Sequence, residues 1–170
     1  MVDFPLLSLM TYLPLVGVFF IAMIQGDDVV KARNAKYAAL YTSLFVFLLS
    51  LLMLSRFEPG NPDFQFVEKK NWMEGFINFQ LGVDGISILF ILLTTFIAPV
   101  CIFSAIHSIK FKIKEFLIAI LVMETLMLGV FCSLDLVIFY LFFEGGLIPM
   151  FLIIGIWGGP KRVYSAFKFF

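Results

Sequence analysis

The sequence predicts an all-α integral membrane protein with five transmembrane helices and the start of a sixth. Hydrophobic residues make up 62% of its 170 residues and charged residues only 14%, whereas soluble domains carry about 25% charged residues. Five apolar segments each have roughly the 20 residues that a helix needs to cross the hydrocarbon core. Their residues do not alternate in polarity at every second position, so the segments are not strands of a membrane barrel.

The five predicted helices define a single membrane domain over residues 1–170, without a soluble domain. The first lacks the basic leader and the Ala-x-Ala cleavage pattern of a signal peptide, so we expect a permanent helix. The fourth is the shortest and contains Glu124. Asp84 and Asp135 stand just before the third and fifth helices and are predicted to cap them. In chain order the helices are Leu6–Ile24, Tyr37–Leu54, Ile86–Ile106, Phe116–Cys132 and Leu136–Trp157.

The connections between the helices indicate the orientation. Nine Lys and Arg residues lie in Gln25–Lys36, in His107–Glu115 and in the tail from Gly158, against three on the other side. Because cytoplasmic and matrix loops are enriched in Lys and Arg, the amino terminus is expected on the periplasmic or intermembrane side. Ser55–Leu81 is the only long polar connection, and its turn cluster PGNP favours a surface loop that lies on the neighbouring helices.

Several kinds of site find no support in the sequence. The net charge of zero argues against nucleic acid as a partner. Cys101 and Cys132 have neither CxxC spacing nor a His nearby, so no disulfide framework and no metal site is predicted. His107 ends the third helix and is predicted to be an interfacial residue, with a role at a cytoplasmic proton entry as the alternative. No motif for a nucleotide, flavin, haem or iron–sulfur cluster is recognisable.

Glu144 is the residue that most restricts the function. It is the only charged residue in Leu136–Trp157, and a carboxylate at the centre of a membrane helix costs about 2.5 to 3.5 kcal/mol on insertion scales. Such an acid is expected to face a polar interior and to take part in transport. The neighbouring Gly145, Gly146 and Pro149 weaken the helix, which suits a hydrated switch, while the alternative is a packing groove with a tolerated proline.

Glu124 is predicted to lie at nearly the same depth as Glu144. Three residues join the fourth and fifth helices, which must therefore be antiparallel neighbours. Glu124 precedes Asp135 by 11 positions and Glu144 follows it by 9, or roughly 16 and 14 Å along the helices. If the two carboxylates face each other, repulsion and desolvation disfavour a second negative charge, so one proton could be shared. The alternative for each acid is a protonated, hydrogen-bonded structural residue.

Four motifs occur together along the chain: FQFVE, LGVDGISILFILLTTFIAPVCI, FFEGGLIPMF and GIWG. In combination they closely resemble the subunit M family of bacterial proton-pumping NADH:quinone oxidoreductase (respiratory complex I), whose mitochondrial counterpart is subunit 4. The resemblance covers nearly the whole chain and is strongest from Phe64 onward. It implies the amino-terminal part of an antiporter-like fold, in which Phe170 falls at the opening of a sixth helix and the later helices are missing.

The resemblance also implies roles for the two acids. The family's fifth-helix glutamate matches Glu144 and pairs with a lysine on the seventh helix, which this chain lacks, and Glu124 matches a fourth-helix acid of less uniform role. No cofactor or metal is implied for this chain, because NADH, FMN, iron–sulfur clusters and quinone belong to partner subunits. The implied partners are other membrane subunits of complex I, the lipid bilayer and the missing carboxy-terminal part of the subunit.

We therefore predict a membrane-arm subunit that contributes to proton translocation coupled to electron transfer, in a bacterial or mitochondrial inner membrane. Glu144 is the candidate proton-transfer residue and Glu124 a candidate relay. One alternative is a subunit of a cation/proton antiporter or of a membrane-bound hydrogenase, since both share the fold and an intramembrane Glu. Another is a non-transporting assembly fragment, because the chain is short.

Overall fold

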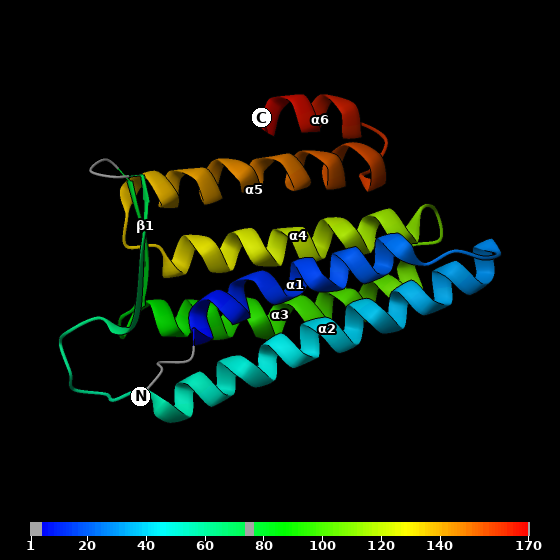
Figure 1. The fold of residues 1–170 in the computed structure, drawn as a ribbon. Helices are drawn as coiled ribbons and strands as arrows, with labels where there is room; N and C mark the ends of the chain where they lie inside the picture. Colours follow the sequence, from blue (N-terminus) through cyan, green and yellow to red (C-terminus); the bar gives the residue numbers. More distant parts are fainter. Residues whose placement is uncertain (1–4, 74–76, 170) are drawn as a thin grey trace.

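The computed structural model describes residues 5–73 and 77–169, and the leader residues 1–4 lie outside them. Within the described residues, five helices are long and apolar enough to span a membrane, as predicted. A short sixth helix also follows where its start was expected. The helices are α1 (Leu6–Met23), α2 (Asp28–Arg56), α3 (Ser87–Ser108), α4 (Ile113–Cys132), α5 (Leu136–Trp157) and α6 (Arg162–Phe169) (Figure 1).

Helix α2 is longer than the sequence predicted. It has 29 residues and begins at Asp28, nine residues before the expected start at Tyr37. Lys31, Arg33 and Lys36 therefore belong to its first turns and not to a connecting loop. Hydropathy detects only the apolar part of a helix, whereas Lys and Arg are good helix formers in water. The connection from α1 to α2 shrinks accordingly to residues 24–27.

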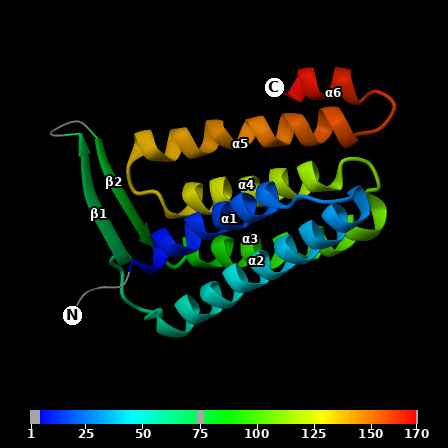
Figure 2. The ribbon, with the colours of Figure 1, turned by 45° about the vertical axis from the view of Figure 1, so that its right-hand side comes forward.

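Residues 65–73 and 77–83 form an antiparallel pair of strands, a hairpin, where only a surface loop was predicted from the sequence. Strand β1 (Gln65–Met73) pairs with β2 (Ile77–Val83), and the register shifts at two places along β1. Such shifts interrupt the two-residue period by which a strand is recognised in a sequence. The hairpin lies at the end of the bundle where α1 begins (Figure 2). There the N–H of Leu134 donates to the carbonyl of Gln80 at 3.0 Å.

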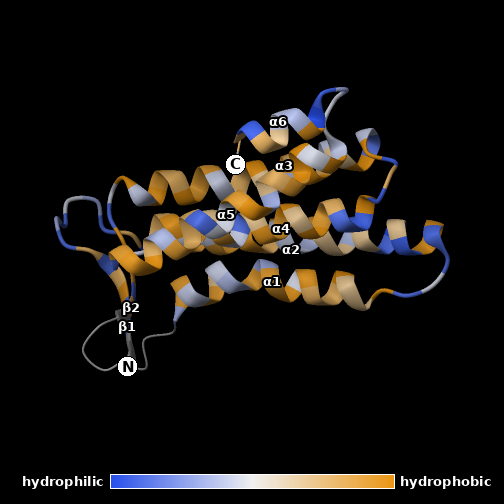
Figure 3. Ribbon diagram, turned by 90° about the horizontal axis from the view of Figure 1, so that it is seen from above, coloured by the Kyte–Doolittle hydropathy of each residue, from blue (hydrophilic) through white to orange (hydrophobic). Residues whose placement is uncertain are grey.

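Helix α4 is the central element of the bundle, since it packs against α1, α2, α3 and α5. Helix α5 lies over α4, and α6 folds back onto α5 as the outermost element (Figure 1). Buried apolar residues form one cluster near the hairpin, around Leu7, Met10 and Leu128, and a second towards the other end, around Ile102 and Leu117. Hydrophilic residues gather at the two ends of the bundle (Figure 3).

Both predicted capping aspartates bind backbone N–H groups. At the start of α5, Asp135 Oδ1 accepts from the N–H groups of Val137 at 2.9 Å and Ile138 at 3.3 Å. Asp84 Oδ1 accepts from the N–H of Ser87, the first residue of α3, at 2.7 Å. Hydrogen bonds from the side chain and backbone of Ser87 hold the pKa of Asp84 below its ordinary value, because they stabilise the ionised carboxylate.

The start of α1 is capped from far along the chain. Pro5 precedes the helix and provides no side-chain cap. Instead, the Glu68 carboxylate on β1 accepts from the N–H of Leu7 at 2.8 Å, from the N–H of Ser8 at 3.1 Å and from the Ser8 hydroxyl. A negative charge at a helix N-terminus also interacts favourably with the helix dipole. Glu68 is the acid of the FQFVE motif, so this motif joins the hairpin to α1.

Replacing Glu68 by alanine is expected to destabilise the start of α1 by about 1–2 kcal/mol, the usual effect of removing a capping side chain. Hydrogen exchange of the Leu7 and Ser8 amides in the assembled protein measures this, and both should exchange about 5- to 30-fold faster. Lys69→Ala, at the exposed neighbouring position of the same strand, is the control and should leave both rates unchanged. Wild-type exchange rates in Glu68→Ala would contradict the capping role.

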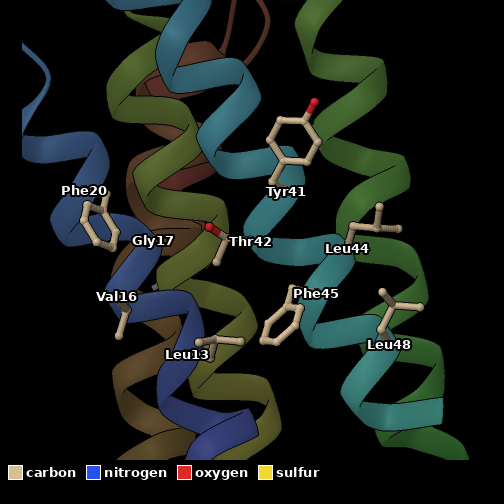
Figure 4. A pocket seen from close by; sticks show the side chains of 9 residues that line it. All are labelled: Leu13, Val16, Gly17, Phe20, Tyr41, Thr42, Leu44, Phe45 and Leu48. Carbon is tan, nitrogen blue, oxygen red and sulfur yellow. The ribbon is translucent and has the colours of Figure 1, made fainter. Parts of the chain in front are cut away.

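An apolar groove of about 480 Å³ runs between α1 and α2 (Figure 4). At its floor the two helices approach closely, because a Cβ atom on Gly17 would lie 2.6 Å from Thr42 Cγ2. Small residues allow this kind of close contact between membrane helices. The side chains that form its walls are uncharged, among them Leu13, Val16, Phe20, Phe45 and Leu48.

Candidate proton-transfer site

Glu144 lies eight positions after the start of α5, in the middle of an unbroken helix of 22 residues. The hydroxyl of Tyr140 donates a hydrogen bond to Glu144 Oε1 at 2.6 Å. Residues four apart lie on the same face of a helix. Tyr140 was not predicted from the sequence, although its spacing of four residues from Glu144 identifies it as a partner on the same helix face.

The face of α5 that carries Glu144 is uncovered. Only 11% of the apolar stretch of α5 is buried, compared with 28% to 44% in the other four spans. Tyr140 and Glu144 are exposed, as are the flanking Leu141, Phe143 and Ile148. A carboxylate on a bare apolar face would be unfavourable in lipid. We therefore expect further protein to cover this face.

Glu124, in contrast, is buried inside the bundle. Its exposed fraction is 3%, and neither carboxylate oxygen has a hydrogen-bond partner among the described residues. It lines a cavity of about 340 Å³ between α3 and α4, together with apolar and sulfur-containing side chains such as Ala98, Cys101 and Met123. A buried polar group without a partner is unfavourable for the fold. Such a group is retained more readily for a function than for stability.

The structure does not bring the two carboxylates face to face. Helix α4 meets α5 through Leu126 and Gly129, because a Cβ atom on Gly145 would contact Leu126 and one on Gly129 would contact the Phe142 ring. At about 100° per residue, Leu126 and Gly129 lie roughly 200° and 140° around the helix from Glu124. Glu124 therefore points away from α5, and the hypothesis that it faces Glu144 is wrong for this structure. The hydropathy of a segment does not predict how a buried helix is rotated about its own axis.

The depth of the two acids agrees better with the sequence argument. Position 126 of α4 lies beside position 145 of α5, and position 129 lies beside position 142. Because the two helices are antiparallel, residues at the same depth have numbers that add up to 271. By this relation Glu124 lies level with position 147 of α5, which is three residues, or about 4.5 Å along the helix axis, from Glu144. The two acids therefore lie within one helical turn of each other in depth, on different sides of α4.

The glycine pair beside Glu144 has two different environments. A Cβ atom on Gly145 would lie 3.1 Å from Leu126 Cδ2, whereas a Cβ atom on Gly146 would meet no atom within 4 Å. Pro149 is buried, and α5 continues through it to Trp157. Packing against α4 therefore explains Gly145, and the proline is tolerated within a continuous helix.

Of the remaining candidates from the sequence, Cys101 lines the same cavity as Glu124, whereas neither Cys132 nor His107 lines it. Cys101 is exposed and Cys132 is buried, and both are free thiols. His107 is exposed in the last turn of α3, where its Nδ1 lies 3.3 Å from the carbonyl oxygen of Phe103. Within residues 5–73 and 77–169, no group of three or more His, Cys, Asp or Glu side chains has the arrangement of a metal site.

Replacing Glu124 by methionine, which has a similar length and no ionisable group, is expected to stabilise the assembled subunit by about 1–3 kcal/mol. The physical reason is that the substitution removes a buried polar group that has no partner. The midpoint of denaturant-induced unfolding in detergent measures the change, and Glu124→Gln, which keeps a polar group, should remain near the wild type. A loss of stability in Glu124→Met would show that the carboxyl group makes an interaction that supports the fold.

The chain is similar in sequence to a family of known membrane proteins. The family described as NADH:quinone oxidoreductase/Mrp antiporter, TM, matches residues 133–170, which include Glu144. The chain is 56% identical over 166 residues to NADH-quinone oxidoreductase subunit M of Rhodobacter capsulatus, covering 97% of this chain and 32% of that protein. It is 46% identical over 166 residues to NADH-ubiquinone oxidoreductase chain 4 of Marchantia polymorpha, covering 96% and 33%.

A solved structure extends the comparison to the fold. The membrane-bound sulfane sulfur reductase, an archaeal respiratory membrane complex, contains a chain that superposes with a TM-score of 0.71 at 19% identity. That match covers 98% of this chain and 24% of the other. The five spans and the family match together define a multi-pass membrane protein of the antiporter-like class. The chain belongs to the family of NADH:quinone oxidoreductase subunit M and chain 4, and it spans about a third of the length of the curated relatives it matches.

Proposed function

We propose that this chain is part of a membrane-arm subunit of NADH:quinone oxidoreductase that contributes to proton translocation coupled to electron transfer. The observation that carries the proposal is Glu144, the only ionisable carboxylate in the 22 residues of α5. Carboxylates inside membrane spans are unfavourable and mark proton or ion paths. The 56% identity to a subunit M supports the choice of complex.

In the proposed mechanism Glu144 alternates between a protonated and an ionised state. When ionised, its carboxylate accepts the hydrogen bond of the Tyr140 hydroxyl, which stabilises the negative charge. A cation supplied by protein outside this chain favours the carboxylate, and withdrawal of that cation lets the acid take up a proton. The uncovered face of α5 leaves room for the cation to approach from that side.

Glu124 is proposed as a relay, and its geometry limits that role. It lies within about one helical turn of Glu144 in depth, but its carboxylate points towards α3 and away from α5. A proton passing between the two acids must therefore go around α4, because direct transfer requires hydrogen-bond distance. Glu124 is accordingly the secondary candidate and Glu144 the primary one.

The redox chemistry of the complex is assigned to other subunits. In this proposal NADH, FMN, iron–sulfur clusters and quinone are bound elsewhere, and this chain holds no cofactor of its own. Its partners are the other membrane subunits, the lipid bilayer and the rest of its own subunit. The last of these supplies the cation that Glu144 requires.

We place the amino terminus on the periplasmic or intermembrane side of a bacterial or mitochondrial inner membrane. The connections α1–α2, α3–α4 and α5–α6 lie together at one end of the bundle, opposite the hairpin (Figure 1). Together with the adjoining turns of α2, α4 and α6, these connections carry most of the Lys and Arg residues of the chain. Because such residues are retained on the cytoplasmic or matrix side, the hairpin and the start of α1 face the other compartment.

A cation/proton antiporter or a membrane-bound hydrogenase is the second candidate. The description of the matching family, which includes Mrp antiporters, favours it. An intramembrane glutamate fits both candidates, so the residue alone does not separate them. The names of the more similar relatives favour the oxidoreductase.

Co-purification tests the choice of complex. An affinity tag on the complete subunit that contains this chain should recover NADH dehydrogenase activity from solubilised membranes, together with NADH-driven proton uptake after reconstitution. Recovery of an intact assembly without NADH oxidation would contradict the proposal and favour the antiporter or hydrogenase. Recovery of the chain without any transport activity would favour an assembly fragment.

A further inference from the structure

A groove with basic walls lies at the end of the bundle opposite the hairpin, between the start of α2 and the connection from α3 to α4. Its volume is about 540 Å³, within the range of sites for small molecules. We call it the basic groove. It is lined by Arg33 and Lys36 of α2, His107 of α3, Lys110 of the connection, and the apolar Val29 and Ile109.

None of the four basic side chains that line the groove forms an ion pair with a described residue. Lys36 Nζ is half-buried and donates to the carbonyl of Ile106 at 3.1 Å, near the end of α3. The one anion on the rim, Asp28, pairs with Lys31 at 3.7 Å. Arg33 and Lys110 are exposed and take part in no described ion pair. The basic groove therefore holds an excess of positive charge at Arg33 and Lys110.

The basic groove lies at the level where a span leaves the hydrocarbon. Its α2 wall is the charged part of the helix, which begins nine residues, or about 13 Å, before the apolar stretch at Tyr37. Nearby, Trp157 Nε1 donates to the carbonyl of Phe111 at 2.8 Å, and Trp side chains are typical of the membrane interface. Val29 is 81% exposed beside the cations, so apolar and basic surfaces adjoin.

We propose that the basic groove binds a phospholipid with an anionic headgroup. The guanidinium of Arg33 and the ammonium of Lys110 would bind the phosphate oxygens, as Arg and Lys do at charge-assisted contacts. Val29 and Ile109 would contact the glycerol and the first acyl carbons. Basic pockets between membrane helices on the cytoplasmic or matrix side suit such headgroups. A free phosphate ion would leave the apolar wall without a partner, which is why we favour a lipid.

The test compares lipid retention by the assembled complex in nanodiscs of phosphatidylcholine with increasing phosphatidylglycerol, read out by native mass spectrometry. Near a membrane surface each removed cation is expected to weaken the interaction about fivefold, so Arg33→Gln with Lys110→Gln should weaken retention about 20- to 30-fold. The charge-preserving pair Arg33→Lys and Lys110→Arg should retain the lipid. Retention by this pair would show that a loss of lipid in the glutamine variant results from the lost charge and not from misfolding.

Arg56→Gln, at the exposed end of α2 on the other side of the membrane, is the matched control and should bind phosphatidylglycerol like the wild type. Unchanged retention in the double glutamine variant would overturn the proposal, as would an equal loss in Arg56→Gln. Displacement of the lipid by inorganic phosphate at similar concentration would also overturn it and indicate a site for free anions. The lipid test does not depend on which respiratory complex contains the chain.

Discussion

Glu144→Gln in the assembled complex is expected to lower proton translocation through this subunit by about a hundredfold while the complex still assembles. Glutamine keeps the size of the side chain but cannot carry a proton between states, and a positioned proton-transfer group contributes about 10²- to 10⁴-fold. Glu144→Asp should do less harm, because it keeps the ionisable group. Its shorter side chain weakens the hydrogen bond that Tyr140 makes at 2.6 Å.

The measurement is NADH-driven proton uptake, linked to quinone reduction, in proteoliposomes at equal complex content. Tyr140→Phe removes the hydrogen bond to the acid and should reduce translocation by about tenfold, which corresponds to the lower end of the roughly 1.5–3 kcal/mol that hydrogen bonds to charged groups contribute. Glu58→Gln, an exposed carboxyl between α2 and the hairpin, is the matched control and should pump normally. Normal pumping and normal assembly in Glu144→Gln would refute the proposed role.

Gly129→Leu is expected to destabilise the subunit by about 3 kcal/mol, the upper end of the range for overpacking. A Cβ atom at Gly129 would lie 2.6 Å from Phe142 Cε1 and would also meet other atoms of the same ring. An aromatic ring cannot bend aside as the end of a flexible chain can, so α5 would have to move. This contact also fixes the rotation of α5 against α4, and therefore the direction of Glu144.

Thermal unfolding of the purified subunit measures this effect, and Phe142→Ala in the same chain should restore much of the lost stability, because the two positions touch. Gly146→Ala is the matched control. It lies on the same helix pair with no atom within 4 Å of the added Cβ, and alanine favours a helix by up to about 1 kcal/mol over glycine. A stable Gly129→Leu variant would show that α5 adapts more freely than the contact indicates.

The elements that the sequence predicted well depend on local chemistry. Runs of apolar residues must become helices in lipid, because no other single segment satisfies its own backbone there. The predicted span Leu136–Trp157 agrees with α5 at both ends, since Asp135 provides a local cap with a recognisable residue type. The first turns of α2 were not predicted, because hydropathy does not identify the part of a helix that extends into water and carries Lys and Arg.

The sequence by itself determined the helical membrane class, the position of Glu144 within its span, and the similar depth of Glu124, because rise per residue and the cost of charge in lipid are fixed quantities. Only the tertiary structure decided which way these side chains point. The contacts of Gly129 and Gly145 turn Glu124 away from α5, and the carboxylate of Glu68 binds α1 from about 60 positions away. Such rotations and long-range bonds depend on how separate segments pack together, and no local pattern of residues contains that information.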